Sequence, residues 1–488
     1  MPDKAVKKVA AMDKPTQSRS SFAGFRRKAM VNVLRAWREV KGSAQVAMTG
    51  QVRPGLPEED IVRLKKQMEE CLDAKGGEIS ARARSVELGR VYLGLNDTGR
   101  QRFLRTLAHE FDVDDAKLKK AMAAYQAATT KPEQVKAEEQ MREALIPSRS
   151  TILKQFNALP NGFKFLVDVR ADLMELTSKD VELKSLEYDL KNILSAWFDI
   201  GLLDLVEISW NSPAAILEKL IEYEAVHRIQ SWEDLKNRLD ADRRVFGFFH
   251  NKMQNEPLIF VQVALVNGMA DNIQKLLDVG SPLGNVDAAD TAIFYSISNA
   301  QKGLAGISFG NFLIKRVVDK LSREFKNIKN FATLSPIPGF RAWLDPKLSD
   351  GSKDLLLATE VKELKQLKQF KEKGDVVKAL PEILSSDWHK DKALAEALQP
   401  ILMRLCARYL ASEKKKDRAL DPVAHFHLSN GARLERINWM GDSSAKGFKQ
   451  SAGMMVNYLY KLSDIDDNHE AYVTEGKIAV GKLVKALG

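Results

Sequence analysis

TAIFYSISNAQKGLAGISFGNFLIKRVVDKLSREFKNIKNFATLSPIPGFRAW, residues 291–343, is the stretch from which the fold can be inferred. Residues 292–297 form a short apolar run rich in β-branched and aromatic side chains, which predicts a buried strand. A loop follows, and residues 311–325 then repeat apolar side chains at helical spacing. The loop glycines are Gly303, Gly306 and Gly310. Strand, glycine loop and helix in this order direct backbone N–H groups at an anion, and we expect a phosphate there.

The glycine loop matches no standard nucleotide motif. It fits neither G-x-x-x-x-G-K-[ST] nor G-x-G-x-x-G, which weighs against ATP and dinucleotides, and glycines before a helix also serve as plain turn residues. Asn311 is the predicted N-cap of the helix. A second short strand is predicted at residues 330–334. Because Pro336 favours an extended residue before it, we expect Ser335 at the mouth of the sheet.

A second motif places two histidines close together in the sequence. Residues 424–429 precede Asn430-Gly431, and Asn-Gly between alternating apolar segments predicts a β-hairpin. In a strand, His425 and His427 point to the same side of the sheet. The residues alone leave three roles open: one arm of a metal site, a structural hydrogen-bonding residue, or a general acid/base. A metal site needs further ligands, and the sequence nominates none.

These segments together resemble malonyl-CoA decarboxylase, a family whose catalytic domain has the fold of the GNAT acetyltransferases. The motifs that carry the resemblance are, in order, FYSISNAQKGLAG, NFLIKRV, LSPIPGF, DPVAHFHLSNGA and RINWMGD. The resemblance implies an α+β fold, with an N-terminal all-α helical bundle domain followed by a GNAT-like mixed α/β catalytic domain. It also implies that the chain is a carboxy-lyase that converts malonyl-CoA to acetyl-CoA and carbon dioxide, and so controls malonyl-CoA level in fatty-acid or malonate metabolism.

The resemblance implies the site residues as well. In the family the residue matching Ser335 is the proton acceptor, that matching His427 is the proton donor, and that matching Tyr460 lies near the active site. The segment implied to bind the CoA moiety is Ala305, Gly306, Ile307, Ser308, Phe309, Gly310 and Asn311. Loss of carbon dioxide leaves a charge that the thioester carbonyl absorbs as an enolate. We therefore expect no cofactor and no metal.

Other functions remain open on the residues. A Ser-His pair also suggests a hydrolase, but Ser335 lacks the G-x-S-x-G motif, and Pro336 removes the N–H that such a motif would use in its oxyanion hole. The alternatives are a GNAT-type acyltransferase that passes an acyl group from CoA to an amine, and a helical protein that binds acyl-CoA without turnover. Discrimination between malonyl- and methylmalonyl-CoA is not determined by these motifs.

Composition points to a globular chain with more than one domain. It has 488 residues, of which 44% are hydrophobic, and a net charge of +10 that is spread along its length. That spread favours a mixed surface over a nucleic-acid partner. No apolar run approaches the roughly 18 residues of a membrane span, and we expect a cytoplasmic protein. Cys71 and Cys406 are too few for a disulfide framework and are expected to be reduced and buried.

The predicted organisation has three parts. Residues 1–21 are a mobile arm, residues 22–190 a helical oligomerisation domain and residues 191–488 the catalytic domain, and the resemblance implies a homotetramer built as a dimer of dimers. Helices are predicted at residues 22–40, 57–74, 80–93, 98–110, 114–128, 132–145, 148–159, 162–176 and 178–190. Further along, strands are predicted at residues 201–210, 244–251 and 257–265, a helical insertion at 355–380 and a helix pair at 393–414.

Overall fold

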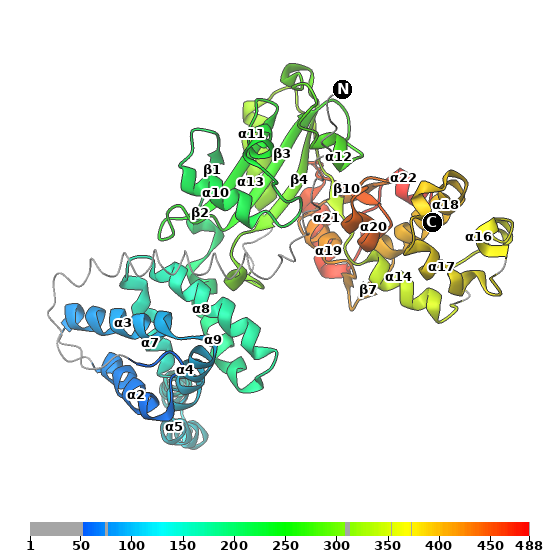
Figure 1. The fold of residues 1–488 in the computed structure, drawn as a ribbon. Coiled ribbons are helices and arrows are strands. Elements are labelled where there is room, and N and C mark those ends of the chain that lie inside the picture. The colour runs from blue at the N-terminus through cyan, green and yellow to red at the C-terminus, as the bar shows by residue number, and fades with distance from the viewer. Residues whose placement is uncertain (1–51, 74–76, 308–312, 353, 372, 488) are drawn as a thin grey trace, which may run out of the picture. The chain divides into compact units, whose positions relative to one another are not determined.

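The computed structural model describes residues 52–73, 77–307, 313–352, 354–371 and 373–487 (Figure 1). The chain divides into two compact units. One is helical and comprises Met1–Trp197 with Lys302–Ile307; the other contains the main sheet and comprises Phe198–Gln301 with Ser308–Gly488. The predicted arm at residues 1–21 and the predicted helix at residues 22–40 lie outside the described residues.

The helical unit confirms the helices predicted between residues 57 and 190. They are α2 (Glu58–Leu72), α3 (Gly77–Gly94), α4 (Asp97–Glu110), α5 (Asp115–Ala127), α6 (Lys131–Ala144), α7 (Arg149–Gln155), α8 (Gly162–Thr177) and α9 (Lys184–Trp197). The last one starts later and runs further than predicted, because Asp180 caps a short 3₁₀ turn at Val181–Leu183 before α9 begins.

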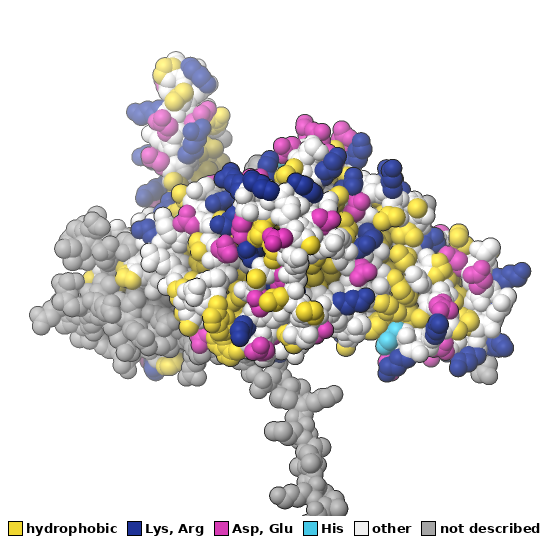
Figure 2. Space-filling model, turned by 90° about the horizontal axis from the view of Figure 1, so that it is seen from above, with side chains coloured by type: hydrophobic (Ala, Val, Ile, Leu, Met, Phe, Trp, Pro, Cys, Tyr) yellow, Lys and Arg dark blue, Asp and Glu magenta, His cyan; other side chains and the backbone are white. Residues whose placement is uncertain are grey.

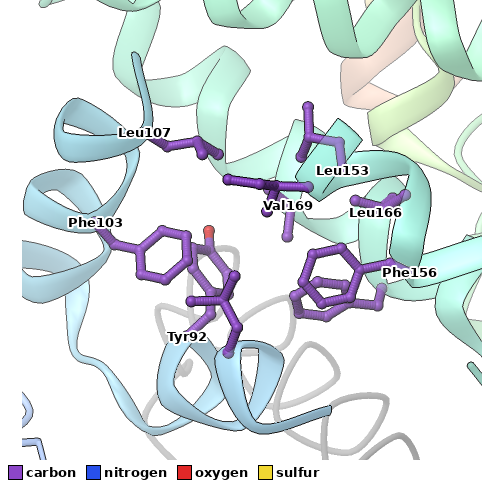
Figure 3. Close-up of a pocket in the computed structure, with 10 residues that line it drawn as sticks. Tyr92, Phe103, Leu107, Leu153, Phe156, Leu166 and Val169 are labelled. Carbon is purple, nitrogen blue, oxygen red and sulfur yellow. The ribbon is translucent and has the colours of Figure 1, made fainter. Parts of the chain in front are cut away.

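The core of the helical unit is apolar and encloses a small cavity (Figure 3). Its lining comes from four helices and a 3₁₀ turn, namely Leu88, Tyr92, Phe103, Leu107, Ile152, Leu153, Phe156, Phe165, Leu166 and Val169. The one hydroxyl in this lining, on Tyr92, donates to Asp172 at 2.9 Å. The lining that the described residues provide is therefore apolar apart from this paired hydroxyl, as in a packed core.

The second unit is built on an eight-stranded mixed sheet. Its strands are β1 (Leu203–Ile208), β2 (Arg243–His250), β3 (Ile259–Val266), β4 (Thr291–Asn299), β5 (Asn330–Thr333), β6 (Ser335–Pro336), β9 (Arg433–Asn438) and β10 (Met455–Leu459). The order is β1-β2-β3-β4-β5-β10-β6, and β9 pairs with β10. Strands β2, β3 and β4 confirm the strands predicted at residues 244–251, 257–265 and 292–297, and β3 pairs antiparallel with both β2 and β4.

The predicted strand and helix are also present, while Gly310 of the loop between them lies outside the described residues. Helix α13 (Leu313–Glu324) follows β4 and leads into β5, which runs parallel to β4. Its apolar face is buried, while Arg316 and Lys320 lie over the Phe248 and Phe246 rings of β2. The predicted N-cap Asn311 lies outside the described residues. This arrangement confirms the expected α+β fold class, with a mixed α/β part after a helical part.

The remaining elements of this unit are short. They are α10 (Ala214–Tyr223), α11 (Trp232–Arg238), α12 (Ile273–Leu276), α14 (Phe340–Ser349), α20 (Ala445–Ser451), α21 (Ile465–Glu475), α22 (Lys482–Lys485), β7 (Lys414–Lys415) and β8 (Arg418–Ala419). The predicted insertion at residues 355–380 consists of α15 (Ala358–Leu364), α16 (Lys368–Lys371) and α17 (Val376–Leu384).

Two predictions for this unit are wrong. Residues 393–414 form mainly one helix, α18 (Lys392–Ala411), which accommodates Pro400 internally, and not a pair. Residues 424–429 belong to helix α19 (Pro422–Ser429) and not to a strand. Asn430-Gly431 does not close a hairpin either: Asn430 caps α19, and Gly431 has a φ of 80°, so this dipeptide ends the helix.

The surface agrees with the mixed charge distribution expected from the sequence. Figure 2 shows Lys and Arg interspersed with Asp and Glu on the face in view. Among the described residues, no helix combines the length and the apolar composition needed to span a bilayer. Cys71 and Cys406 are buried free thiols, and burial raises the pKa of Cys71 to about 11.

Candidate active site

Ser335 lies where the strand after α13 ends its pairing with β4 and continues to pair with β10. It follows β5 by one residue and begins β6, in which it pairs with Val456 of β10. Pro336 supplies no N–H to the ladder and fixes the extended conformation of the residue before it. The Ser335 side chain is buried, with 5% of its surface exposed.

His427 reaches this point from helix α19. The helix begins at Asp421, whose Oδ1 accepts from the N–H groups of Val423 (2.9 Å) and Ala424 (3.0 Å), and Pro422 occupies the first turn. His427 is 3% exposed. His425 does not share its side, because two residues are about 200° apart around a helix. Its Nδ1 instead lies 2.9 Å from the Tyr472 hydroxyl.

Three of the residues named from the sequence are joined by hydrogen bonds. The Ser335 Oγ lies 3.1 Å from His427 Nε2, and His427 Nδ1 lies 2.8 Å from the Tyr460 hydroxyl. Ser335 donates its own proton to Thr333 Oγ1 at 2.9 Å. Since that hydroxyl proton is used, Nε2 is the protonated nitrogen toward Ser335, and Nδ1 accepts from Tyr460. One consistent direction of donation therefore runs from Tyr460 through His427 and Ser335 to Thr333.

Burial determines the charge state of this chain of groups. It lowers the pKa of His427 from 6.5 to about 3, so the imidazole is neutral near pH 7. Burial also raises the pKa of Tyr460 well above 10, which keeps its hydroxyl protonated. The ring of Tyr458 stacks on His427 with centroids 4.7 Å apart. Its buried hydroxyl has no hydrogen-bond partner among the described residues.

Asp421 ties the serine loop to the histidine helix. While its Oδ1 caps α19, its Oδ2 accepts from the Gly339 N–H at 3.2 Å and from the Tyr409 hydroxyl at 3.3 Å. Gly339 belongs to the LSPIPGF motif, and a Cβ added to it would lie 2.2 Å from the Tyr409 hydroxyl oxygen. Burial raises the pKa of Asp421. The carboxyl group thus connects the two segments that present Ser335 and His427.

The segment implied to bind CoA is described only in part. Ala305, Gly306 and Ile307 belong to the helical unit, while Ser308, Phe309, Gly310 and Asn311 lie outside the described residues. The described part follows a 3₁₀ turn at Lys302–Leu304, and Gly306 has a φ of 72°, which favours glycine.

Comparison with known proteins decides which family these residues belong to. Residues 201–487 match the malonyl-CoA decarboxylase C-terminal domain, and residues 111–198 match the malonyl-CoA decarboxylase N-terminal domain. The chain belongs to the malonyl-CoA decarboxylase family. It is 41% identical over 418 residues to the mitochondrial malonyl-CoA decarboxylase of Anser anser anser, an alignment that covers 83% of each chain. The mitochondrial malonyl-CoA decarboxylase of Rattus norvegicus is 39% identical over 414 residues, covering 81% of this chain and 83% of the relative.

Two crystal structures of bacterial malonyl-CoA decarboxylases share the fold. The protein from Rhodopseudomonas palustris superposes with a TM-score of 0.79 at 39% identity, covering 87% of this chain and 99% of that one. The protein from Agrobacterium vitis gives a TM-score of 0.78 at 41% identity, with the same coverage. The family assignment made from the sequence motifs is confirmed.

Thr333 and Asp421 are polar residues at the site that the sequence reasoning did not single out. Thr333 accepts from Ser335 and also from the backbone N–H of Tyr458, at 3.1 Å. A sequence signal was present for Asp421, because Asp followed by Pro is typical of an N-cap and first helical residue. Thr333 had no such signal beyond its place two residues before Ser335, on the same side of an extended chain.

Proposed function

We propose that this chain converts malonyl-CoA to acetyl-CoA and carbon dioxide, with Ser335, His427 and Tyr460 as the residues that handle the reacting group. The observation that carries the proposal is the buried hydrogen-bond chain that joins these three side chains in a member of the malonyl-CoA decarboxylase family.

The reaction requires an electron sink, and the substrate contains one. When the carbon–carbon bond to the carboxylate breaks, the electron pair moves into the thioester carbonyl, and an enolate and neutral carbon dioxide result. Fixed hydrogen-bond donors at a developing oxyanion typically contribute about 3–4 kcal/mol each to such a step. The enolate carbon then takes up one proton. The protein therefore has to stabilise an oxyanion and deliver a proton.

His427 is the proposed proton donor to the enolate carbon. In the free protein its imidazole is neutral, because burial lowers its pKa to about 3. A substrate anion beside Nε2 favours the protonated ring and raises this pKa again. Tyr460 at Nδ1 fixes the orientation of the ring as the charge changes. Proton transfer by a positioned imidazole typically accelerates a reaction by about 10²- to 10⁴-fold.

Ser335 is proposed to contact the malonyl group directly. Its hydroxyl either holds the carboxylate out of the plane of the thioester or relays the proton from His427 Nε2 to the carbon. Both roles use the 3.1 Å contact to Nε2. An acyl-serine intermediate is disfavoured, since Pro336 has no N–H to stabilise a tetrahedral oxyanion.

The CoA moiety is proposed to bind at Ala305–Asn311, the loop between β4 and α13. Two observations support this. The loop and α13 connect the parallel strands β4 and β5, and Gly306 has a left-handed backbone conformation. Such a loop can direct N–H groups at a pyrophosphate.

One assay tests the reaction. The purified chain is incubated with malonyl-CoA without added metal or cofactor, and acetyl-CoA, carbon dioxide and free thiol are followed together. We expect acetyl-CoA and carbon dioxide in equal amounts, no free thiol, and loss of both products in His427→Ala and Ser335→Ala. Free CoA that accumulates only with an added amine would instead identify an acyltransferase, and binding without turnover would identify an acyl-CoA-binding protein.

We further propose the biological setting implied by the resemblance. Residues 22–190 would assemble a homotetramer, arranged as a dimer of dimers, and residues 191–488 would be the catalytic domain that controls malonyl-CoA level in fatty-acid or malonate metabolism. The two buried free thiols fit a reducing compartment such as the cytoplasm. Light scattering of the purified chain tests the tetramer, and cell fractionation tests the location.

A further inference from the structure

The helical unit holds the glycine segment that precedes the proposed CoA-binding loop. The buried guanidinium of Arg170, in α8, donates from one nitrogen to the carbonyl oxygens of Gly303 (2.6 Å) and Ala305 (3.0 Å). Gly303 also packs directly on the same helix, because a Cβ added to it would lie 1.8 Å from the Val167 carbonyl oxygen. The position of residues 302–307 is thus determined by α8.

Glu187 of α9 balances the charge of Arg170. Its Oε1 accepts from Arg170 Nε at 3.0 Å and from Nη2 at 2.7 Å. Glu187 lies four residues before Lys191, the spacing at which a glutamate usually pairs with a lysine on a helix. Because Arg170 engages this carboxylate, the ammonium group of Lys191 is directed elsewhere.

That ammonium group lies beside Gly306. A Cβ added to Gly306 would be 3.7 Å from Lys191 Nζ and 4.0 Å from its Cε, and apart from the two chain neighbours it would meet no other heavy atom of the described residues within 4 Å. Lys191 is half-buried, and it forms no ion pair with a carboxylate in the part of the chain that the structure describes. A cation with no acidic partner among the described residues therefore lies next to a glycine with φ 72°.

We propose that Lys191 binds a phosphate group of the CoA substrate. The proposal rests on the proposed function and names a residue outside the predicted loop. A lysine ammonium donates charge-assisted hydrogen bonds to phosphate oxygens, and glycine lets an anion approach the backbone closely. Arg170 is a positioning residue in this proposal, since its guanidinium is buried against the carbonyl groups and Glu187.

The test compares two substrates in matched variants. Lys191→Gln removes the charge beside Gly306, and Lys184→Gln removes the same charge from an exposed position two turns earlier on α9. Malonyl-CoA carries the phosphate groups, and malonyl-pantetheine lacks them. We expect Lys191→Gln to raise KM for malonyl-CoA about tenfold, the loss typical of one charge-assisted hydrogen bond. kcat and the KM for malonyl-pantetheine should not change, Lys184→Gln should behave as wild type, and Lys191→Arg should restore most of the affinity.

Two results would overturn the proposal. One is an equal loss with malonyl-CoA and malonyl-pantetheine, which would show that Lys191 acts on structure or on the acyl group. The other is an unchanged KM for both substrates. If the wild-type chain does not decarboxylate malonyl-CoA at all, the proposed function fails, and calorimetric titration with CoA tests Lys191 separately: the Kd should rise about tenfold in Lys191→Gln only.

Discussion

The Tyr460 hydroxyl offers a direct test of the hydrogen-bond chain at the candidate site. Tyr460→Phe keeps the ring and removes only the oxygen that lies 2.8 Å from His427 Nδ1. Both groups are buried, so the imidazole nitrogen is left without a partner and without water. An unsatisfied buried polar group costs about 1–3 kcal/mol. We expect the free energy of unfolding to fall by this amount, which lowers Tm by about 2–4 °C per kcal/mol.

The same substitution should affect the reaction more than it affects binding. Loss of the donor at Nδ1 frees the imidazole to rotate and to change tautomer, so Nε2 no longer holds its proton toward Ser335. We expect kcat to fall by about ten- to a hundredfold, which is part of the 10²- to 10⁴-fold that acid–base catalysis contributes. KM for malonyl-CoA should stay within about twofold of wild type, since Tyr460 is placed to contact the histidine.

Tyr458→Phe is the matched control. Tyr458 is two residues away on β10, is fully buried and packs on the same imidazole ring, but its hydroxyl has no partner among the described residues. Removing an unpaired buried hydroxyl should leave stability unchanged or slightly increased. Equal losses of Tm and kcat in Tyr458→Phe and Tyr460→Phe, measured by calorimetry and by acetyl-CoA formation, would refute the assigned hydrogen bond.

Three further predictions follow from burial and packing. First, His427 has a pKa of about 3 when folded against 6.5 ordinarily, so the unfolded chain binds a proton first as pH falls. Its contribution to stability is complete above about pH 6.5 and is lost toward pH 3, by up to about 1.4 kcal/mol per pH unit. Urea unfolding across this pH range measures the effect: the free energy of unfolding should depend less steeply on pH in His427→Gln than in wild type. Second, Gly303→Ala should raise KM for malonyl-CoA at least about tenfold in steady-state assays, because the new methyl group collides with the Val167 carbonyl and displaces the loop. Third, Asp421→Ala should lower the free energy of unfolding by about 1–2 kcal/mol and reduce kcat, because the N-cap of α19 and the link to Gly339 are both lost.

Controls for these variants are matched substitutions at other positions of the chain. Asp375 caps α17 through the N–H groups of Val377 and Lys378, so Asp375→Ala should cost similar stability with kcat unchanged. Gly94→Ala places a methyl group where, apart from its own helix, no atom of the described residues lies within 4 Å, and KM should not change. If the free energy of unfolding depends on pH equally steeply in His427→Gln and wild type, His427 is not a neutral buried imidazole in the folded protein. Normal kcat in Asp421→Ala, or normal KM in Gly303→Ala, would contradict the positioning roles.

The sequence predicted the part of the fold that local patterns determine. The residues of β4 are mostly apolar and buried, with β-branched and aromatic side chains among them. The apolar residues of α13 recur at helical spacing, so both elements could be located from the sequence. The helix at residues 422–429 was missed because the Asn430-Gly431 dipeptide was given more weight than the Asp421-Pro422 start signal. Both dipeptides are helix boundaries here, one at each end of α19.

Contacts between distant residues had no local signal. Arg170 and Gly303 are 133 positions apart, and Ser335 and His427 are 92 apart. The first pair could not be anticipated, since a buried arginine inside a helix reads as an ordinary exposed residue until its partners are known. The second pair was named from the family motifs alone. The hydrogen bond between its members is a property of the fold, which brings α19 against the β5–β6 junction.

The helix found where the sequence predicted a strand changes the chemical interpretation of the two histidines. In a strand, His425 and His427 would share one side and could act together; on α19 they diverge, and only His427 reaches Ser335. Among the described residues of the hydrogen-bond chain, a single neutral imidazole among buried hydroxyl groups brings no positive charge before the substrate arrives. In the proposed mechanism the negative charge of the substrate then raises the pKa of the imidazole, so the proton is recruited where the enolate forms. A permanently charged group would instead stabilise the starting carboxylate as strongly as the enolate, and it would lower the barrier less.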